Sequence, residues 1–355
     1  MPSYSDDHHL ALPMGTLLNE FRLEEILGSG GFGITYRALD THLQRKVAIK
    51  EFFPNDLATR LASYKVAAQS PDDAGEFARQ LKRFLHEATI LAQLNHPNIV
   101  KVSRYLQANG TGYFVMEYLD GLNLGQYFAR RSKPPAQADL LRILHPILDG
   151  LECLHSQKLL HRDLKPDNIL VVGENRPVII DLGVAKSTVR YSVTGEAFCA
   201  PGYTPFEQYQ THGNMGPWTD IYALGASLHK IITGELPPES LKRLDHDPYL
   251  PLVKRLADRY SRGFLAAIDQ ALAVKEKDRP VSVAKWRLSL SLPPLAPAFT
   301  PVSHAEPAAV YSISPPSLPD ASAPPSPFLE SIDFRYVAAA SLLLLAALLL
   351  TFCLF

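Results

Sequence analysis

A change from strand-like to helix-like patterns near Leu122 limits the possible folds more than any other feature of the chain. Before this point, short β-prone runs alternate with turn residues around a single helical segment. After it, apolar residues recur at helical spacing over three long stretches. Strands followed by helices are typical of the α+β class. The sequence therefore predicts a two-lobed α+β fold with a small β-rich lobe and a larger helical lobe, and we find no internal repeat.

The first lobe is expected to contain two β-prone runs joined by glycines, two further strands and a helix. The glycine hairpin covers residues 21–40, the strands cover 46–53 and 112–119, and the helix covers 76–94. In the second lobe, helical spacing is found in residues 138–157, 218–234 and 263–280.

Length and composition narrow the class of protein. The 355 residues are enough for a large two-lobed domain, and 35 basic residues nearly balance 36 acidic ones. No bulk charge therefore indicates a nucleic-acid partner. The three cysteines (Cys153, Cys199 and Cys353) lack metal-ligand spacing and suit a reducing compartment. Residues 1–19 predict an N-terminal tail without a signal peptide.

The last 20 residues, Tyr336–Phe355, carry no charge. As a helix they would be about 30 Å long, which matches the hydrocarbon core of a bilayer. The alternative, a buried helix of a soluble domain, fits poorly with the Pro-, Ser- and Ala-rich linker at 291–335. We therefore expect a single-pass anchor at 336–355 in the inner or plasma membrane. Arg335 places the preceding residues on the cytoplasmic side, and small residues at Ala338–Ser341 leave a homodimer open.

A glycine cluster in the first lobe fits the pattern G-x-G-x-x-G at Gly28, Gly30 and Gly33. A dinucleotide-binding turn would be followed by a helix, but here a β-prone run follows. The glycines therefore belong to a hairpin, which can lay backbone N–H groups over phosphates. Lys50, at the end of the next strand, is either a solvated edge residue or a neutraliser of phosphate charge.

Glu87 lies on the inward stripe of the expected helix at 76–94, between Phe84 and Leu91. A carboxylate in that place needs a cationic partner, because an unpaired buried charge is costly. We interpret Lys50 as this partner. Without Lys50, an exposed glutamate on an amphipathic helix would be the default interpretation.

Two polar motifs in the second half of the chain stand between apolar segments. They are HRDLKPDN at 161–168 and IIDLG at 179–183. Asp163 can accept a proton from a hydroxyl nucleophile, and Lys165 adds positive charge nearby. Asn168 and Asp181 supply the hard oxygen ligands that Mg²⁺ shares with phosphates. Each acid alone is a common structural residue, but this order and spacing indicate a catalytic site.

Taken together, these motifs make the chain resemble a bacterial, eukaryotic-type (Hanks-type) serine/threonine protein kinase. The resemblance covers residues 20–290, with lobes at 20–117 and 118–290. It implies binding of ATP with Mg²⁺, or Mn²⁺ as a substitute, and transfer of the γ-phosphate to hydroxyls of protein substrates. By this resemblance, the ATP-binding residues are Gly28, Gly30, Gly33, Ala48, Lys50, Met116, Glu117, Leu119 and Leu170.

The resemblance also assigns roles in catalysis and in support of the site. Asp163 would be the catalytic base, Lys165 would contact the γ-phosphate, and Lys50 would pair with Glu87. Asn168 and Asp181 would be the metal ligands. Glu207 and Arg279 resemble the pair that ties the activation segment to the second lobe, and Asp220 resembles the residue that braces the catalytic loop.

Several positions depart from the family pattern. Leu182 replaces the usual phenylalanine, Thr35 replaces a valine, and Ala200 replaces a threonine whose hydroxyl contacts the catalytic aspartate and lysine in the family. The segment 51–75 is an insertion that either caps the lobe or regulates it.

The main functional hypothesis is an active protein kinase that phosphorylates its own activation segment at Thr194 or Ser192, with Arg162 as the partner of the phosphate. Ordinary loop hydroxyls are the alternative for these two residues. An ATP-binding pseudokinase scaffold at the membrane is the alternative for the whole chain. A small-molecule phosphotransferase fits less well, because such enzymes usually lack the GYTPFE segment and the partner Arg279.

Overall fold

The computed structural model describes residues 10–182, 200–210 and 212–290. The expected linker at 291–335, the expected anchor at 336–355 and the two candidate phosphorylation sites lie outside these residues. Among the helices of the described part of the chain, none has the length and apolar character needed to cross a bilayer.

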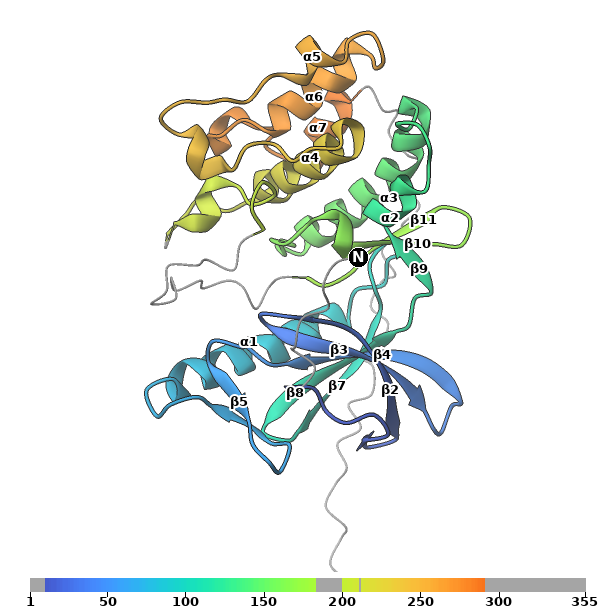
Figure 1. Cartoon of the computed structure of the whole chain (residues 1–355), viewed down its shortest axis with the longest axis vertical. Helices are drawn as coiled ribbons and strands as arrows, with labels where there is room; N and C mark the ends of the chain where they lie inside the picture. Colours follow the sequence, from blue (N-terminus) through green and yellow to red (C-terminus); the bar gives the residue numbers. More distant parts are fainter. Residues whose placement is uncertain (1–9, 183–199, 211, 291–355) are drawn as a thin grey trace, which may run out of the picture. The chain divides into compact units, whose positions relative to one another are not determined.

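The first lobe is built on a six-stranded antiparallel sheet in the order β1-β2-β3-β4-β8-β7 (Figure 1). Its strands are β1 (Leu17–Leu18), β2 (Phe21–Gly30), β3 (Gly33–Asp40), β4 (Arg45–Phe52), β7 (Val102–Ala108) and β8 (Thr111–Glu117). The glycine cluster joins β2 to β3, as the sequence predicts, and Gly30 pairs with Gly33 at the turn.

The sheet has a buried surface on each face. On one face a cluster that includes Tyr36, Tyr113 and Leu12 brings the N-terminal segment onto the strands. Along β3 the residues alternate between buried and half-buried, which is the period of a strand with two different faces. On the other face of β3, Gly33 and Thr35 line the candidate site.

Helix α1 (Ala74–Leu91) packs on the sheet through the apolar stripe that the sequence predicts. Phe84 stacks on Phe114 of β8 with ring centroids 3.9 Å apart and lies 5.2 Å from Phe52 of β4. Such aromatic contacts add to the hydrophobic stabilisation that burial provides. They fix the helix that carries Glu87 against the strand that carries Lys50.

The insertion between β4 and α1 contains a small hairpin that the sequence did not predict. Strand β5 (Ala58–Arg60) pairs with β6 (Val66–Ala68), and the hairpin lies beside the main sheet (Figure 1). The N–H of Val66 donates to the carbonyl oxygen of Asn109 in the β7–β8 turn (2.7 Å). The insertion is therefore hydrogen-bonded to the lobe as a folded element.

The second lobe is mainly helical and also contains a three-stranded sheet. The strands are β9 (Gly121–Asn123), β10 (Ile169–Val172) and β11 (Arg176–Ile179), in the order β11-β10-β9. The helices are α2 (Leu124–Ala129), α3 (Gln137–Ser156), α4 (Pro217–Thr233), α5 (Leu252–Arg255), α6 (Arg262–Ala271) and α7 (Val283–Ser289).

Helices α3 and α4 match expected ones, α6 matches an expected one only in part, and α2, α5 and α7 were not predicted. The pattern at 263–280 predicts one helix, but α6 ends at Ala271 and a short turn at Glu276–Asp278 follows. The last part of that segment, VKEKDRP, has few apolar residues and ends in proline, so it cannot continue the helix's buried stripe. This ending frees Arg279 to point into the lobe, where it is buried.

Candidate active site

One pocket of about 690 Å³ lies between the glycine hairpin and the start of the second lobe. Every residue that the sequence predicts for the site lines it, apart from Glu87. From the first lobe these are Gly28, Gly30, Gly33, Ala48, Lys50, Met116, Glu117 and Leu119, and from the second lobe Asp163, Lys165, Asn168, Leu170 and Asp181. The structure therefore brings together residues that are as many as 153 positions apart (from Gly28 to Asp181) in one cavity of the size of a ligand site.

The third glycine of the hairpin is required by a close approach of the backbone. A Cβ atom at Gly33 would lie 2.1 Å from the carbonyl oxygen of Glu51 on β4. By contrast, a Cβ at Gly28 or at Gly30 would meet no atom within 4 Å. Those two positions leave the roof of the pocket open, which is what a backbone contact with a ligand needs.

Lys50 forms an ion pair with Asp181 across the pocket. Its side chain is 18% exposed, whereas that of Asp181 is 40% exposed. The sequence predicts a different partner, Glu87. This glutamate is buried, as predicted, at 3% exposure, and its charge raises the pKa of Arg162 against the larger lowering caused by burial. Pairing of Lys50 with Glu87 stays a prediction.

The catalytic-loop candidates are connected by the amide of Asn168. Its Nδ2 donates to the backbone oxygen of Asp163 (2.7 Å) and to Oδ2 of the same residue (2.9 Å). Lys165 Nζ lies 3.8 Å from that carboxylate oxygen. Because both N–H groups of Asn168 point at Asp163, its Oδ1 is left as an acceptor.

Asp220 of α4 holds the backbone of the loop that carries Asp163. Its Oδ2 accepts from the N–H of His161 (2.9 Å) and contacts His155 Nε2 (2.8 Å), while Oδ1 accepts from the N–H of Arg162 (2.8 Å). Burial raises the pKa of Asp220, but the hydrogen bond and charge of His155, the charge of His161 and the N–H of Arg162 outweigh it. The net pKa is lowered, so Asp220 is a carboxylate at neutral pH.

Backbone contacts also bring Asp181 next to Asn168. The N–H of Ile180 donates to the carbonyl oxygen of Asn168 (2.9 Å), and the ring of His161 contacts the carbonyl oxygen of Ile180 through Nε2 (2.9 Å). Asp181 itself has a φ of 59°, in the left-handed region that is uncommon outside glycine. The conformation turns the chain at the end of β11 and directs the carboxylate into the pocket.

The donor set suits a hard divalent cation that is shared with a phosphate ligand. Asn168 Oδ1 and the carboxylate of Asp181 are oxygen ligands of the kind that Mg²⁺ prefers. Within the described ranges, no cluster of three or more acidic, histidine or cysteine side chains could hold a metal by itself. A cation here would complete its coordination with phosphate oxygens and water.

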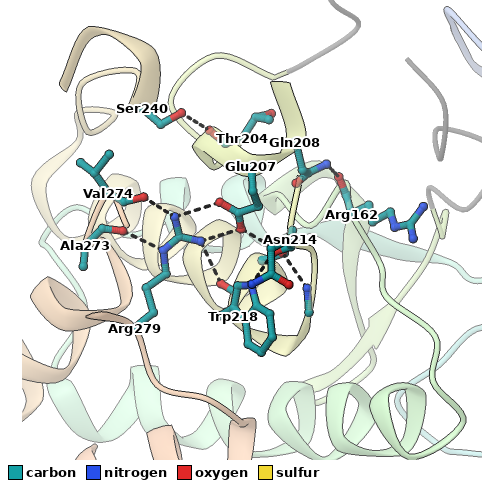
Figure 2. Close-up of polar contacts among 12 residues, drawn as sticks. Arg162, Thr204, Glu207, Gln208, Asn214, Trp218, Ser240, Ala273, Val274 and Arg279 are labelled. Carbon is teal, nitrogen blue, oxygen red and sulfur yellow. Dashed lines mark hydrogen bonds and ion pairs between the residues drawn. The ribbon is translucent and has the colours of Figure 1, made fainter. Parts of the chain in front are cut away.

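A buried ion pair between Arg279 and Glu207 connects two segments of the second lobe (Figure 2). Arg279 donates from Nη1 to Glu207 Oε1 (2.7 Å) and from Nη2 to Oε2 (3.1 Å). It also donates to the carbonyl oxygens of Ala273 and Val274, and Thr219 donates to Glu207 (2.9 Å). The pair is thus almost fully hydrogen-bonded, which a buried pair needs.

One residue that the sequence did not single out connects this pair to the loop that carries Asp163. Gln208 follows Glu207, and its Nε2 donates to the backbone oxygen of Arg162 (2.9 Å; Figure 2). A glutamine in a polar run has no sequence signal that identifies such a contact. Further pocket residues missed in the sequence are Leu27, Val100, Asp120, Asn123, Gln126 and Asp167.

The two-lobed fold and its pocket place the chain in the class of protein-kinase-like folds. Comparison with known sequences supports this: the profile described as "Protein kinase domain" matches residues 21–282. The chain belongs to the protein kinase domain family.

Individual relatives agree with the family. Serine/threonine-protein kinase C of Synechocystis sp. is 32% identical over 282 residues, which cover 76% of this chain and 49% of that protein. Serine/threonine-protein kinase pkn3 of Myxococcus xanthus is 30% identical over 293 residues, covering 78% and 50%. The chain therefore spans about half the length of these curated relatives.

A solved structure titled "PpkA-294 apo form" is similar over nearly its whole length. It is 38% identical, covers 79% of this chain and 99% of that chain, and superposes with a TM-score of 0.71. The kinase domain of PknI from Mycobacterium tuberculosis, at 20% identity and a TM-score of 0.55, shares the fold.

Proposed function

We propose that the chain is an ATP-dependent serine/threonine protein kinase. The observation that carries the proposal is the convergence of Lys50, Asp163, Asn168 and Asp181 on one pocket, with Asn168 bonded directly to Asp163. Family membership and the names of the curated relatives support the same activity. Phosphoryl transfer needs positioning and charge neutralisation, and these side chains supply both.

In this proposal the residues of the pocket have separate tasks. Ala48, Met116 and Leu170 provide an apolar surface for the adenine, and Lys50 and Lys165 neutralise phosphate charge. Asp163 orients the acceptor hydroxyl and takes its proton as the phosphate is transferred. Mg²⁺, or Mn²⁺ in its place, held by Asn168 and Asp181, would neutralise further charge on the phosphates.

A protein acceptor is favoured by the segment that follows Ala200. Glu207 and Arg279 hold this segment in the second lobe, and Gln208 connects it to the backbone of Arg162 beside the proposed base. A surface fixed next to the reacting groups suits an extended peptide. Ala200 lacks the hydroxyl that the family pattern places here, so we expect transfer to peptides to be slower than in kinases that have it.

The test is phosphate transfer from labelled ATP by the purified full chain. Transfer that depends on a divalent cation and disappears in Asp163→Asn and in Asp181→Asn would support the proposal. ATP-dependent thermal stabilisation without transfer to protein in any cation would contradict it and would indicate the pseudokinase alternative instead.

Regulation by autophosphorylation at Thr194 or Ser192 is a second part of the proposal. Both residues lie outside the described part of the chain. Its support is Arg162, whose Nε and Nη1 are buried with no hydrogen-bond partner among the described residues. Burial lowers the pKa of this guanidinium, and the charges of Asp220 and Glu87 oppose that effect. A phosphate would supply the missing acceptors. Phosphopeptide mapping after incubation with ATP that found residues 183–199 unmodified would contradict this part.

The localisation is the third part of the proposal. Residues 336–355 would anchor the chain in the inner or plasma membrane, with the kinase domain on the cytoplasmic side and residues 291–335 as a spacer. The bilayer would then be a partner, and a homodimer formed through the anchor stays open. Alkaline carbonate extraction that released the full chain from membranes would contradict the anchor.

A further inference from the structure

The insertion between Lys50 and α1 touches the glycine hairpin directly. The N–H of Asn55 donates to the carbonyl oxygen of Gly31 (2.9 Å), and the N–H of Phe53 donates to that of Phe32 (3.1 Å). Gly31 and Phe32 form the turn between β2 and β3, at the roof of the pocket. Two backbone bonds therefore tie the tip of the hairpin to a segment that is not part of the hairpin.

The insertion is in turn fixed to β4 through a buried polar network. Glu51, the residue after Lys50, is fully buried and accepts from Arg60 (2.7 Å), Tyr36 (2.9 Å) and Tyr113 (2.9 Å). The side chain of Arg60 is only 4% exposed. Three donor side chains, from the insertion and from strands β3 and β8, thus meet at the carboxylate of Glu51 on β4.

The remaining donors of Arg60 hold the insertion's own turn and the N-terminal segment. Arg60 Nη1 donates to the carbonyl oxygen of Tyr64 (3.1 Å), and Nε donates to that of Leu10. Its guanidinium also lies 5.0 Å from the ring centre of Phe53, in cation–π contact. Because Phe53 donates to the glycine hairpin, the network and the hairpin tip are linked through adjacent residues.

We propose that residues 53–69 form a built-in brace that holds the glycine hairpin in place over the phosphates of ATP. In this role Arg60 and Glu51 are positioning residues for nucleotide binding, acting through Asn55 and Phe53. A hairpin rich in glycine loses much conformational entropy when it closes on a ligand. A brace that orders it beforehand lowers that cost at the binding step and so increases affinity for the nucleotide.

The inference rests on the proposed function, since it assumes that ATP lies under the hairpin. It also explains why the insertion stands immediately after Lys50. The hydrogen bonds begin at Phe53, only three residues beyond the lysine, so that one strand positions both the lysine and the hairpin above it.

Asn55→Pro tests the brace by removing a single backbone donor. The N–H of Leu57 donates to the carbonyl oxygen of Pro54 (3.0 Å), so Asn55 is the second residue of a turn, a place that proline favours. Asn55→Ala is the matched control because it keeps the N–H. Relative to the control, the full-length proline variant should show an ATP KM raised about two- to tenfold, the range for one lost hydrogen bond, with kcat nearly unchanged.

Hydrogen exchange provides a readout that needs no turnover. The amides of residues 31–33 should exchange faster in Asn55→Pro than in Asn55→Ala, and the dissociation constant of a fluorescent ATP analogue should rise by the same factor as KM. Equal exchange and equal affinity in the two variants would overturn the brace. If wild type binds the analogue but transfers no phosphate, the proposed function fails while this comparison still decides on the brace.

A gentler variant keeps the proposal testable if Asn55→Pro does not fold. Gln69 Nε2 donates to the carbonyl oxygen of Asn55 (3.0 Å) and supports the turn from the exposed side. Gln69→Ala should change the amide exchange rates and the nucleotide affinity in the same direction as Asn55→Pro, by a smaller factor. Lys65→Ala, at an exposed position in the turn between β5 and β6, should change neither. Identical behaviour of these two variants would also overturn the proposal.

Discussion

The two lobes each contain a buried pair of a glutamate and an arginine, and the two pairs are built differently. Glu207 and Arg279 are 72 positions apart and form two parallel contacts. Glu51 and Arg60 are nine positions apart and form one contact, and two tyrosines complete the carboxylate's partners. The first pair is a long-range tie between segments of the second lobe. The second is a local brace in which three donors share one carboxylate.

The two pairs show two ways in which hydrogen bonds can offset the cost of a buried carboxylate. Arg279 also donates to the carbonyl oxygens of Ala273 and Val274. Nearly all hydrogen bonds of this pair therefore depend on the arginine. Glu51 would keep two phenol donors if Arg60 were lost. Because the cost of breaking a buried pair is mainly the cost of the group left unpaired, the two pairs should respond unequally to the same substitution.

Arg279→Met should have the largest effect. It would leave the buried carboxylate of Glu207 with Thr219 as its remaining side-chain donor among the described residues, and should lower the free energy of unfolding by about 3–5 kcal/mol. Urea unfolding of the full chain measures this. Arg255→Met is the control, because its ion pair with Glu235 is largely exposed and should contribute about 0–1 kcal/mol. A loss for Arg279→Met no greater than for the control would show that the long-range tie contributes little.

Arg60→Met should lower the free energy of unfolding by about 3 kcal/mol, at the low end of the range for a broken buried pair, because Tyr36 and Tyr113 still donate to Glu51. The double variant with Glu51→Gln removes the unpaired charge as well. It should therefore be less destabilised than the sum of the two single variants, as measured by a double-mutant cycle. Strict additivity would mean that Glu51 and Arg60 do not stabilise one another.

Because of the buried tyrosines of the first-lobe network, we expect the free energy of unfolding to depend on pH in the alkaline range. Burial, and then the charge of Glu51, raise the pKa of Tyr113 well above its ordinary value of 10.0. A pKa raised by folding contributes stability that is complete below the unfolded value and is lost as pH rises above it. Between pH 10 and 11 the free energy of unfolding of Tyr113→Phe should therefore fall less steeply than that of wild type, by up to about 1.4 kcal/mol per pH unit. Equal slopes would contradict this account.

The same comparison shows what the sequence could predict. The glycine hairpin, α1, α3 and α4 follow from apolar periodicity and turn residues, which are local signals. The pocket residues could be predicted from several motifs that indicate a phosphate-binding catalytic site only when they are taken together. Glu207 and Arg279 could be paired only through resemblance to a family, since nothing local connects positions that far apart.

The brace could not be predicted for the opposite reason. Its strands, β5 and β6, are three residues each, too short for a period to be read. A clue is present in Glu51, a charged residue within the apolar run KVAIKEFF, which indicates a buried carboxylate in need of a partner. The identity of that partner depends on where the insertion folds back. The ion pair of Lys50 with Asp181 depends in the same way on tertiary placement.

The smallest expected effect concerns the single contact that connects the second-lobe pair to the proposed base. Gln208→Ala removes the donor to the carbonyl oxygen of Arg162 and leaves the nucleotide pocket untouched. One hydrogen bond contributes about 1 kcal/mol, so kcat for phosphate transfer should fall by about two- to tenfold while the ATP KM stays constant. Gln210→Ala, two residues further along and exposed, should leave both constants unchanged. This split is the opposite of the one expected for Asn55→Pro, which should change KM and spare kcat. If Gln208→Ala changed KM instead, the second-lobe contact would act on nucleotide binding. The expectation that the first-lobe brace affects KM and the second-lobe contact affects kcat would then be wrong.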